Sequence, residues 1–99
     1  MIIRIVKMHF HPDAVDDFLD IYGRTEAAIL HMEGCTYLEL MRVTDDPNVF
    51  VTISHWDSTT ALNNYRKSEL FKNVWRRVKP HFSQRPEAYS LERFRGIGH

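Results

Sequence analysis

The sequence predicts an α+β domain in which a four-stranded antiparallel sheet carries helices on one face, the ferredoxin-like split βαβ arrangement. Three observations favour this fold. Apolar residues alternate in several short segments, helical patterns lie between some of these segments, and strong turn signals separate the elements. The order is strand, helix, strand, strand, two helices, strand. The 99 residues are predicted to form a single domain, with a core that covers about 1–95.

Residues 2–10 are predicted to form the first strand, because their apolar side chains fall into two alternating sets. Ile3 and Ile5 belong to one face. The other face carries Ile2, Val6, Met8 and Phe10. Both faces of this strand are therefore expected to be largely buried.

A long helix is predicted at about 12–33. Pro12 suits its first turn, and Gly34 follows its last apolar residue and is able to adopt the left-handed conformation that ends many helices. Gly23 in the middle costs about 1 kcal/mol relative to alanine. The apolar stripe consists of Val15, Phe18, Leu19, Tyr22, Ile29 and Met32.

A β-hairpin is predicted next, with strands at 35–44 and 49–56 joined by the turn Asp45-Asp46-Pro47-Asn48. In the first of these strands the alternation places Cys35, Tyr37, Met41 and Val43 on one face, opposite Leu38 and Leu40.

Two short helices and a last strand complete the predicted domain. Ser58 is a plausible N-cap for a helix that continues to about residue 66. Ser68 begins a second helix, which is expected to end near Pro80 because proline disrupts helix interiors. Residues 85–94 supply the last strand. We expect the aromatic residues of this region to lie near one another: Trp56, Tyr65, Phe71 and Trp75.

Charge and composition argue against several classes of function. Thirteen basic and thirteen acidic residues give a formal net charge of zero, which argues against nucleic-acid binding and against attraction to an anionic membrane. No segment is apolar enough to cross a membrane, and residues 1–10 do not resemble a signal peptide. Cys35 is the single cysteine and fits a reducing compartment. We therefore expect a cytoplasmic protein.

The predicted sheet is apolar on both faces, whereas the helices are able to cover only one of them. A second copy of the chain is the simplest cover for the remaining face, so we expect a homodimer through the open sheet face. Burying about eight such side chains yields a gross stabilisation of roughly 12–24 kcal/mol. The candidates include Ile3, Ile5, Val49, Val51 and Ile53. The alternation does not decide which of the two sets faces the partner.

The segments ISHW and DSTTALNNYRKSELFKNV, together with HPDAVDDFLDIY, resemble the antibiotic biosynthesis monooxygenase domain of the dimeric α+β barrel superfamily. The resemblance covers residues 1 to about 95. It implies a homodimer in which each subunit holds a small cavity between its sheet and its helices. It also implies a small planar aromatic or quinone-like ligand in that cavity.

The resemblance suggests that Trp56 lines this cavity and stacks on the ligand, although plain core packing explains a buried indole equally well. Thr52 and Ser54 share its strand phase. The tyrosines on the helices are able to hydrogen-bond a ligand carbonyl, and Trp75 contributes to the same cleft. The substrate-binding candidates are Trp56, Thr52, Tyr65, Tyr22 and Trp75.

Arg76 and His9 are the catalytic candidates. A cation near a phenol favours the phenolate, which is able to give an electron to dioxygen without metal or flavin, although the helix dipole alone also explains a basic residue near a helix end. His9 is able to accept the phenolic proton, and His55 is the alternative base. His9 and His11 lie two residues apart, but no further ligands converge on them, so we expect no metal.

The resemblance also extends to haem-degrading relatives, which place an iron-binding histidine late in the last helix. Trp75 stands at that position here, so haem is disfavoured and no cofactor is expected. The predicted function is a small-molecule monooxygenase that oxidises a phenol or quinol with dioxygen, without metal or flavin. The alternatives are a non-catalytic ligand-binding or stress-response protein and, further, a haem-binding or haem-degrading relative or an isomerase.

Overall fold

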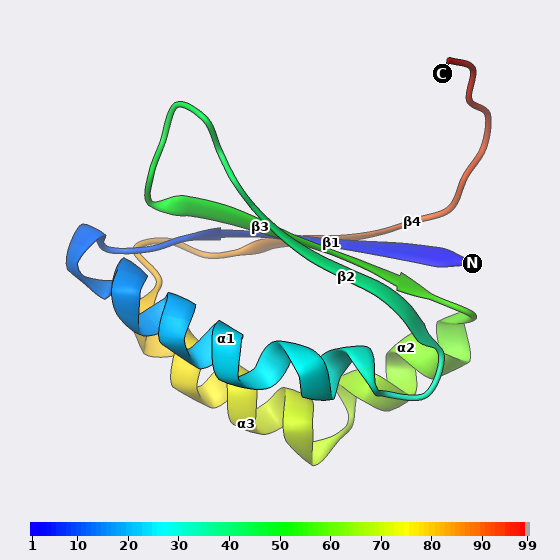
Figure 1. Cartoon of the computed structure of the whole chain (residues 1–99), viewed down its shortest axis with the longest axis horizontal. Coiled ribbons are helices and arrows are strands. Elements are labelled where there is room, and N and C mark those ends of the chain that lie inside the picture. Colours follow the sequence, from blue (N-terminus) through cyan, green and yellow to red (C-terminus); the bar gives the residue numbers. More distant parts are fainter. Residues whose placement is uncertain (99) are drawn as a thin grey trace.

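A computed structural model describes residues 1–98 and confirms the predicted fold. The sheet forms one layer, and the helices form a second layer against one of its faces (Figure 1). All neighbouring strands are antiparallel and lie in the order β2-β3-β1-β4. The strands are β1 (Ile2–His9), β2 (Cys35–Arg42), β3 (Val49–Trp56) and β4 (Glu87–Leu91).

Three α-helices and two single turns of 3₁₀-helix connect the strands. The α-helices are α1 (Val15–Leu30), α2 (Thr59–Arg66) and α3 (Glu69–Val78). The 3₁₀ turns are η1 (Pro12–Ala14) and η2 (Lys79–His81). None of the helices in the described residues is long and apolar enough to cross a membrane.

The core lies between the sheet and the helices and is built largely from aromatic rings. The rings of Phe10 and Phe18 stack with their centroids 4.2 Å apart, and the ring of Phe50 lies 5.4 Å from that of Phe18. Met8 and Val78 complete the cluster from β1 and α3. The strand phase that contains Val6, Met8 and Phe10 is therefore the phase that faces the helices.

Serine caps start the two short helices, as predicted. The Ser58 hydroxyl accepts a hydrogen bond from the backbone N–H of Ala61 at 3.1 Å. The Ser68 hydroxyl accepts one from the backbone N–H of Phe71, also at 3.1 Å. Each bond satisfies an N–H group that has no partner inside the helix. These caps fix the start of α2 and α3 and so place their aromatic residues beneath the sheet.

Four elements are shorter than predicted: β1 by one residue, β2 by two, and α1 and β4 by more. The helix α1 ends at Leu30 rather than near residue 33, because the chain turns tightly: the N–H of Met32 bonds to the carbonyl of Ile29 at 3.1 Å. The strand β4 covers Glu87–Leu91 rather than 85–94. Within residues 1–98 it pairs only with β1, and this pairing ends where Leu91 lies opposite Ile3.

A β-bulge corrects the predicted faces of β2. Tyr37 lies opposite His55, whereas Cys35 lies opposite Trp56, with the register shift between Cys35 and Tyr37. The extra residue, Thr36, moves Cys35 to the other side of the strand. Cys35 therefore shares the helix-covered face with Trp56. The simple alternation predicted that Cys35 shares a face with Tyr37, and this prediction is wrong.

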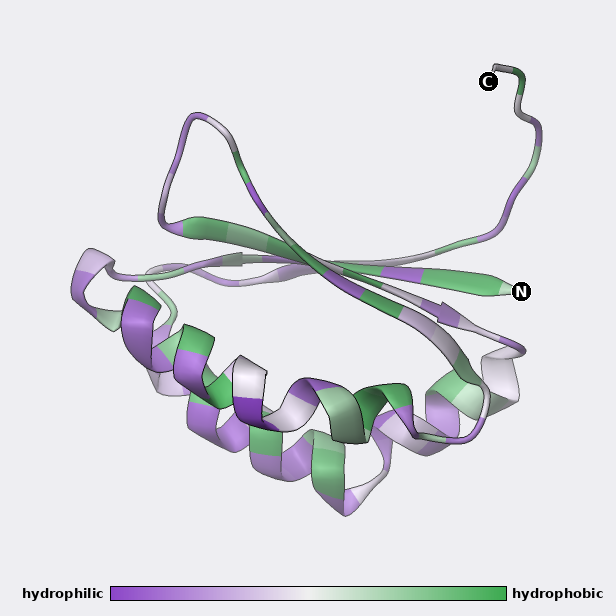
Figure 2. Ribbon diagram, in the orientation of Figure 1, coloured by the Kyte–Doolittle hydropathy of each residue, from purple (hydrophilic) through white to green (hydrophobic). Residues whose placement is uncertain are grey.

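The other face of the sheet carries no helix among the described residues, and we call it the open face. The strands show long hydrophobic stretches in Figure 2 although helices cover only one side of the sheet. Ile5 lies directly opposite Ile53 on one side and Tyr89 on the other. The apolar side chains of the open face are Ile3, Ile5, Tyr37, Met41, Val51, Ile53, Tyr89 and Leu91.

Tyr89 and Leu91 are 54% and 44% exposed, so the apolar character of the open face reaches the molecular surface. Isolated exposed apolar residues are normal, but a contiguous patch on a sheet is typical of an interaction surface. The loop between β2 and β3 and the C-terminal segment also lie on this side of the sheet (Figure 1).

Gly34 is predicted to be irreplaceable at the turn between α1 and β2. Its φ of +85° is left-handed, and a Cβ atom there collides with the side chain of Ala61. Gly34→Ala is expected to lower the free energy of unfolding by more than about 1 kcal/mol, measured by urea denaturation. Gly23→Ala is the matched control, because the space that its new methyl group enters holds no other atom within 4 Å.

The control is expected to raise stability by about 0.5–1 kcal/mol, because Gly23 lies inside a helix where alanine is preferred. Equal effects of the two substitutions contradict the assigned role of Gly34.

Candidate functional site

A cavity of about 400 Å³ lies between the helix-covered face of the sheet and the helices. Its size falls in the range of about 300–1,000 Å³ that is usual for small-molecule sites. Most of its walls are apolar. The apolar and aromatic lining residues are Val6, Met8, Phe18, Ile29, Leu38, Leu62, Phe71, Val74, Trp75, Val78, Pro86 and Ala88.

A few polar groups interrupt the apolar wall. They are Arg4, Tyr22, Thr52, Ser54, Tyr65 and Arg66. Thr52 and Ser54 come from β3, where alternate residues point to the same face of the sheet. The buried Ser54 hydroxyl accepts a hydrogen bond from the indole N–H of Trp56 at 2.9 Å. An apolar cavity with a small number of polar groups is typical of a site that orients a small organic ligand.

Tyr22 and Tyr65 bring two neutral hydroxyl groups to the cavity. Burial raises the pKa of Tyr65 to about 12, with smaller contributions from Cys35 and Tyr22. Burial also raises the pKa of Tyr22 to about 12, assisted by the negative charges of nearby acidic residues and by Cys35. Both phenols stay protonated at neutral pH and are able to donate a hydrogen bond to a ligand oxygen.

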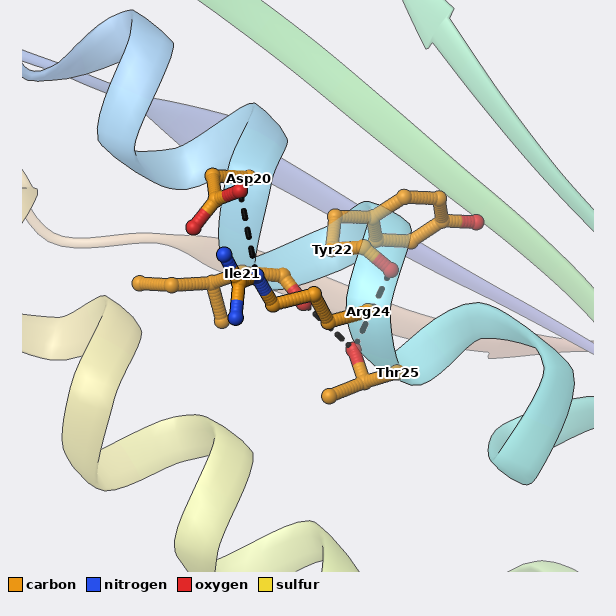
Figure 3. A network of polar contacts seen from close by, with 5 residues as sticks. All are labelled: Asp20, Ile21, Tyr22, Arg24 and Thr25. Carbon is orange, nitrogen blue, oxygen red and sulfur yellow. Dashed lines mark hydrogen bonds and ion pairs between the residues drawn. The ribbon is translucent and has the colours of Figure 1, made fainter.

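The position of Tyr22 follows from the local structure of α1. Its side chain points from the helix toward the sheet (Figure 3). The hydroxyl of Thr25 donates to the backbone carbonyls of Ile21 and Tyr22, at 2.9 and 3.2 Å. The exposed ion pair of Arg24 with Asp20, at 3.1 Å, occupies the solvent side of the same helix. The tyrosine is therefore held on the buried face of α1.

The four aromatic residues expected to lie together form a continuous row, which confirms that expectation. The ring of Trp56 stacks on that of Tyr65 at a centroid distance of 4.9 Å. Phe71 meets Tyr65 edge-on at 5.2 Å, and Trp75 stacks on Phe71 at 5.9 Å. Tyr65, Phe71 and Trp75 line the cavity, so α2 and α3 supply an aromatic wall opposite the sheet.

Trp56 lies outside the cavity lining. Its side chain is 0% exposed and is packed behind Tyr65 and Ser54, both of which line the cavity. The indole thus supports two lining residues and has no surface of its own in the cavity. The other four substrate-binding candidates line it: Tyr22, Thr52, Tyr65 and Trp75.

The two catalytic candidates also lie outside the cavity. His9 belongs to the open-face phase of β1, and its Nε2 atom lies 3.9 Å from a carboxylate oxygen of Glu87. Arg76 is exposed on α3 and donates a hydrogen bond to the side-chain oxygen of Asn73 at 2.7 Å. Neither side chain is therefore placed to act on a ligand in this cavity.

A family model described as antibiotic biosynthesis monooxygenase matches residues 1–77, which is most of the chain. The chain belongs to this family. The match spans β1 through most of α3, and so includes most of the cavity wall. No curated protein matches the chain.

Solved structures show the same fold for the whole domain. A crystal structure of an antibiotic biosynthesis monooxygenase is 22% identical, with a TM-score of 0.89, and the alignment covers 96% of this chain and 100% of that one. A conserved protein from Methanosarcina mazei Go1 is 19% identical, with a TM-score of 0.89 and coverage of 95% and 94%. Rv0793 from Mycobacterium tuberculosis is 18% identical, with a TM-score of 0.88 and coverage of 98% of both chains.

In this antibiotic biosynthesis monooxygenase domain, two arginines that the sequence reasoning missed reach the cavity. Arg4 lies on β1 in the same phase as Val6 and Met8, so the alternation places these three residues on one face, and the structure shows that the helices cover this face. Arg66 is the last residue of α2. For Arg66, the sequence gives no comparable signal, because it depends on how α2 docks against the sheet.

No group of three His, Cys, Asp or Glu side chains among residues 1–98 is arranged to hold a metal ion. Within the same residues, no histidine lines the cavity. The lining therefore offers planar aromatic surfaces, tyrosine and threonine hydroxyls, and guanidinium groups. This set of groups suits a flat organic ligand that carries oxygen atoms.

Proposed function

We propose that this domain is a monooxygenase that oxidises a phenol or quinol with dioxygen, without metal or flavin. The observation that carries the proposal is a cavity of about 400 Å³ with an aromatic wall and few polar groups, in a member of the antibiotic biosynthesis monooxygenase family. In such a reaction a phenol and dioxygen give a quinone and water. One oxygen atom enters the ring, the other becomes water, and the substrate supplies all the electrons.

The proposed binding mode relies on the cavity walls in the positions that the structure shows. The ring of the substrate lies against Tyr65, Phe71 and Trp75, whose apolar surfaces exclude water from it. The hydroxyls of Tyr22 and Tyr65 donate hydrogen bonds to the oxygen of the substrate. A hydrogen bond donated to a phenolate favours the charged form, and the phenolate is the form that gives up an electron to dioxygen.

The open cavity argues against one form of the non-catalytic alternative. A protein of the same fold in which the aromatic side chains serve only as packing is expected to fill the space with Trp56 and Trp75. Trp56 is instead packed away from the cavity, and Trp75 forms part of its wall. The remaining volume is large enough for a bicyclic aromatic compound.

We also propose that the open face binds a second copy of the chain to form a homodimer. Its strands carry Ile5, Val51 and Ile53 beside the exposed side chains of Tyr89 and Leu91. A two-fold axis brings the same patch of both subunits together, so an apolar patch on this face covers its own copy in an isologous dimer. Lys7 on β1 and Glu87 on β4 lie opposite each other in the sheet and contribute charges of both signs to the same face.

Oxygen consumption tests the proposed reaction. Purified protein, freed of metal with a chelator, is mixed with a panel of quinols and anthrones in an oxygen electrode. We expect saturable uptake above the rate of spontaneous oxidation for at least one compound. Ala88→Trp, which places an indole in the cavity, is expected to lower that uptake by about tenfold or more.

The matched control is Ala28→Trp, which adds the same indole to the exposed surface of α1. It is expected to keep the rate of the unmodified protein. The proposed function is contradicted if none of the compounds supports oxygen uptake above the spontaneous rate. It is also contradicted if the two variants consume oxygen at the same rate.

A further inference from the structure

Within residues 1–98, two guanidinium groups line the cavity without an acidic partner. Arg4 comes from β1 and Arg66 from the end of α2, and the lining residues include no aspartate or glutamate. The ion pairs found within residues 1–98 belong to other cations: His9, Arg24 and Lys72. A half-buried charge such as that of Arg4 is normally paired with an opposite charge, and the cavity lining offers none.

Arg4 is held in place by the strands on either side of it. Its Cα partners are Ser54 on β3 and Ser90 on β4, and its Nη1 atom donates a hydrogen bond to the Ser90 hydroxyl at 2.9 Å. A guanidinium carries five N–H donors, so this bond orients the group and leaves most of its donors available. The remaining donors are the ones that are able to bind a ligand.

The positive charge of Arg66 acts on Arg4. Burial lowers the pKa of the Arg4 guanidinium, and the like charge of Arg66 lowers it further. Both guanidiniums line the same cavity, and their like charges repel each other in the ligand-free protein. An anion between them removes this repulsion and adds charge-assisted hydrogen bonds on both sides.

The pair lies where the cavity meets solvent. Arg66 is exposed and also lines the cavity, whereas Arg4 is half-buried. Tyr65, the residue before Arg66, already belongs to the aromatic wall. A ligand whose ring lies on this wall thus presents one end to the two guanidiniums.

We propose that Arg4 and Arg66 together bind a carboxylate of the ligand, so that the cavity takes an aromatic acid in preference to a neutral aromatic compound. The planar fork of a guanidinium matches the two oxygens of a carboxylate, which a single phenol oxygen does not. This inference deepens the proposed function and rests on it for the aromatic character of the ligand. It does not depend on turnover.

Binding of two unreactive probes tests the subsite. 2-Naphthoate and 2-naphthamide have the same ring and similar size, but only the first is charged. Calorimetric titration of the full chain is expected to give at least about tenfold tighter binding of the naphthoate. Arg4→Gln and Arg66→Gln are each expected to reduce that ratio, and the double variant is expected to abolish it. Arg77→Gln, an exposed arginine of α3 outside the cavity, is the matched control and keeps the ratio.

Three results overturn the subsite. The two probes bind with equal affinity, the preference for naphthoate persists in the double variant, or neither probe binds at millimolar concentration. If Arg4→Gln fails to fold, Arg66→Gln still decides the question because Arg66 is exposed. The proposed function fails separately. Charge-selective binding without oxygen uptake supports the subsite and contradicts the reaction. Oxygen uptake with neutral quinols, without charge-selective binding, supports the reaction and contradicts the subsite.

Discussion

Trp56→Ala is expected to lower the free energy of unfolding by about 3–5 kcal/mol, the usual loss for a large aromatic removed from a core. The indole is 0% exposed, stacks on Tyr65 at 4.9 Å and donates a hydrogen bond to the Ser54 hydroxyl at 2.9 Å. Its removal leaves a void and deprives Ser54 of its partner. Because small domains have a total stability of about 5–15 kcal/mol, this is a large fraction of the total.

Thermal unfolding followed by circular dichroism measures the effect. For a domain of this size each 1 kcal/mol moves the midpoint by about 4–8 °C, so we expect a fall of at least about 12 °C. Trp56→Phe is the matched control: it keeps a ring against Tyr65, loses the hydrogen bond and is expected to cost clearly less. A midpoint for Trp56→Ala within about 5 °C of the unmodified protein contradicts the assignment of Trp56 to the core.

Val51→Glu is expected to convert the proposed homodimer into a folded monomer. Val51 lies on the open face, directly opposite Lys7 of β1 and Met41 of β2. A new carboxylate there is able to interact with Lys7 within one subunit, so the isolated fold tolerates it. In a dimer the same carboxylate is removed from water against an apolar partner face, which costs several kcal/mol.

Sedimentation velocity at micromolar concentration distinguishes the two states. We expect the unmodified chain to sediment as a dimer and Val51→Glu as a monomer with an unchanged circular dichroism spectrum. Ala28→Glu adds the same charge to the exposed surface of α1 and is expected to remain dimeric. A monomeric unmodified chain, or a dimeric Val51→Glu variant, contradicts the proposed role of the open face.

Most of the fold could be predicted from the sequence, because each element carries its own local signal. The alternation in β1, the turn before Val49 and the caps at Ser58 and Ser68 all agree with one topology. The bulge near Cys35 could not be predicted. A one-residue insertion into a ladder exchanges the two faces without a characteristic composition, so alternation alone assigned Cys35 to the wrong face.

The cavity was partly predictable, since alternation and helical periodicity report which face a residue occupies but not how deep it lies. Tyr65 and Trp56 both point into the space between the layers, yet only Tyr65 reaches the cavity. The periodicity of α3 did contain an unused signal. Phe71, Trp75 and Val78 follow the spacing of one helix face, and Arg76 falls outside it.

The strand β1 shows the same limit of the alternation. His9 shares the phase of Ile3 and Ile5, whereas Arg4 shares the phase of Met8. Once it is known which face of β1 lies against the helices, Arg4 is placed on the cavity side of the strand and His9 on the opposite side. The sequence did not reveal that phase, because both sets of residues are apolar enough to be buried.

A crystal structure of the protein with its best quinol substrate tests the central claim most directly, because it shows where the ring binds. We predict electron density for the ring inside the cavity, in contact with Tyr65 and Trp75 and with an oxygen within hydrogen-bond distance of the Tyr22 or Tyr65 hydroxyl. Density for the ligand only outside the cavity, with the space between sheet and helices empty, contradicts the account.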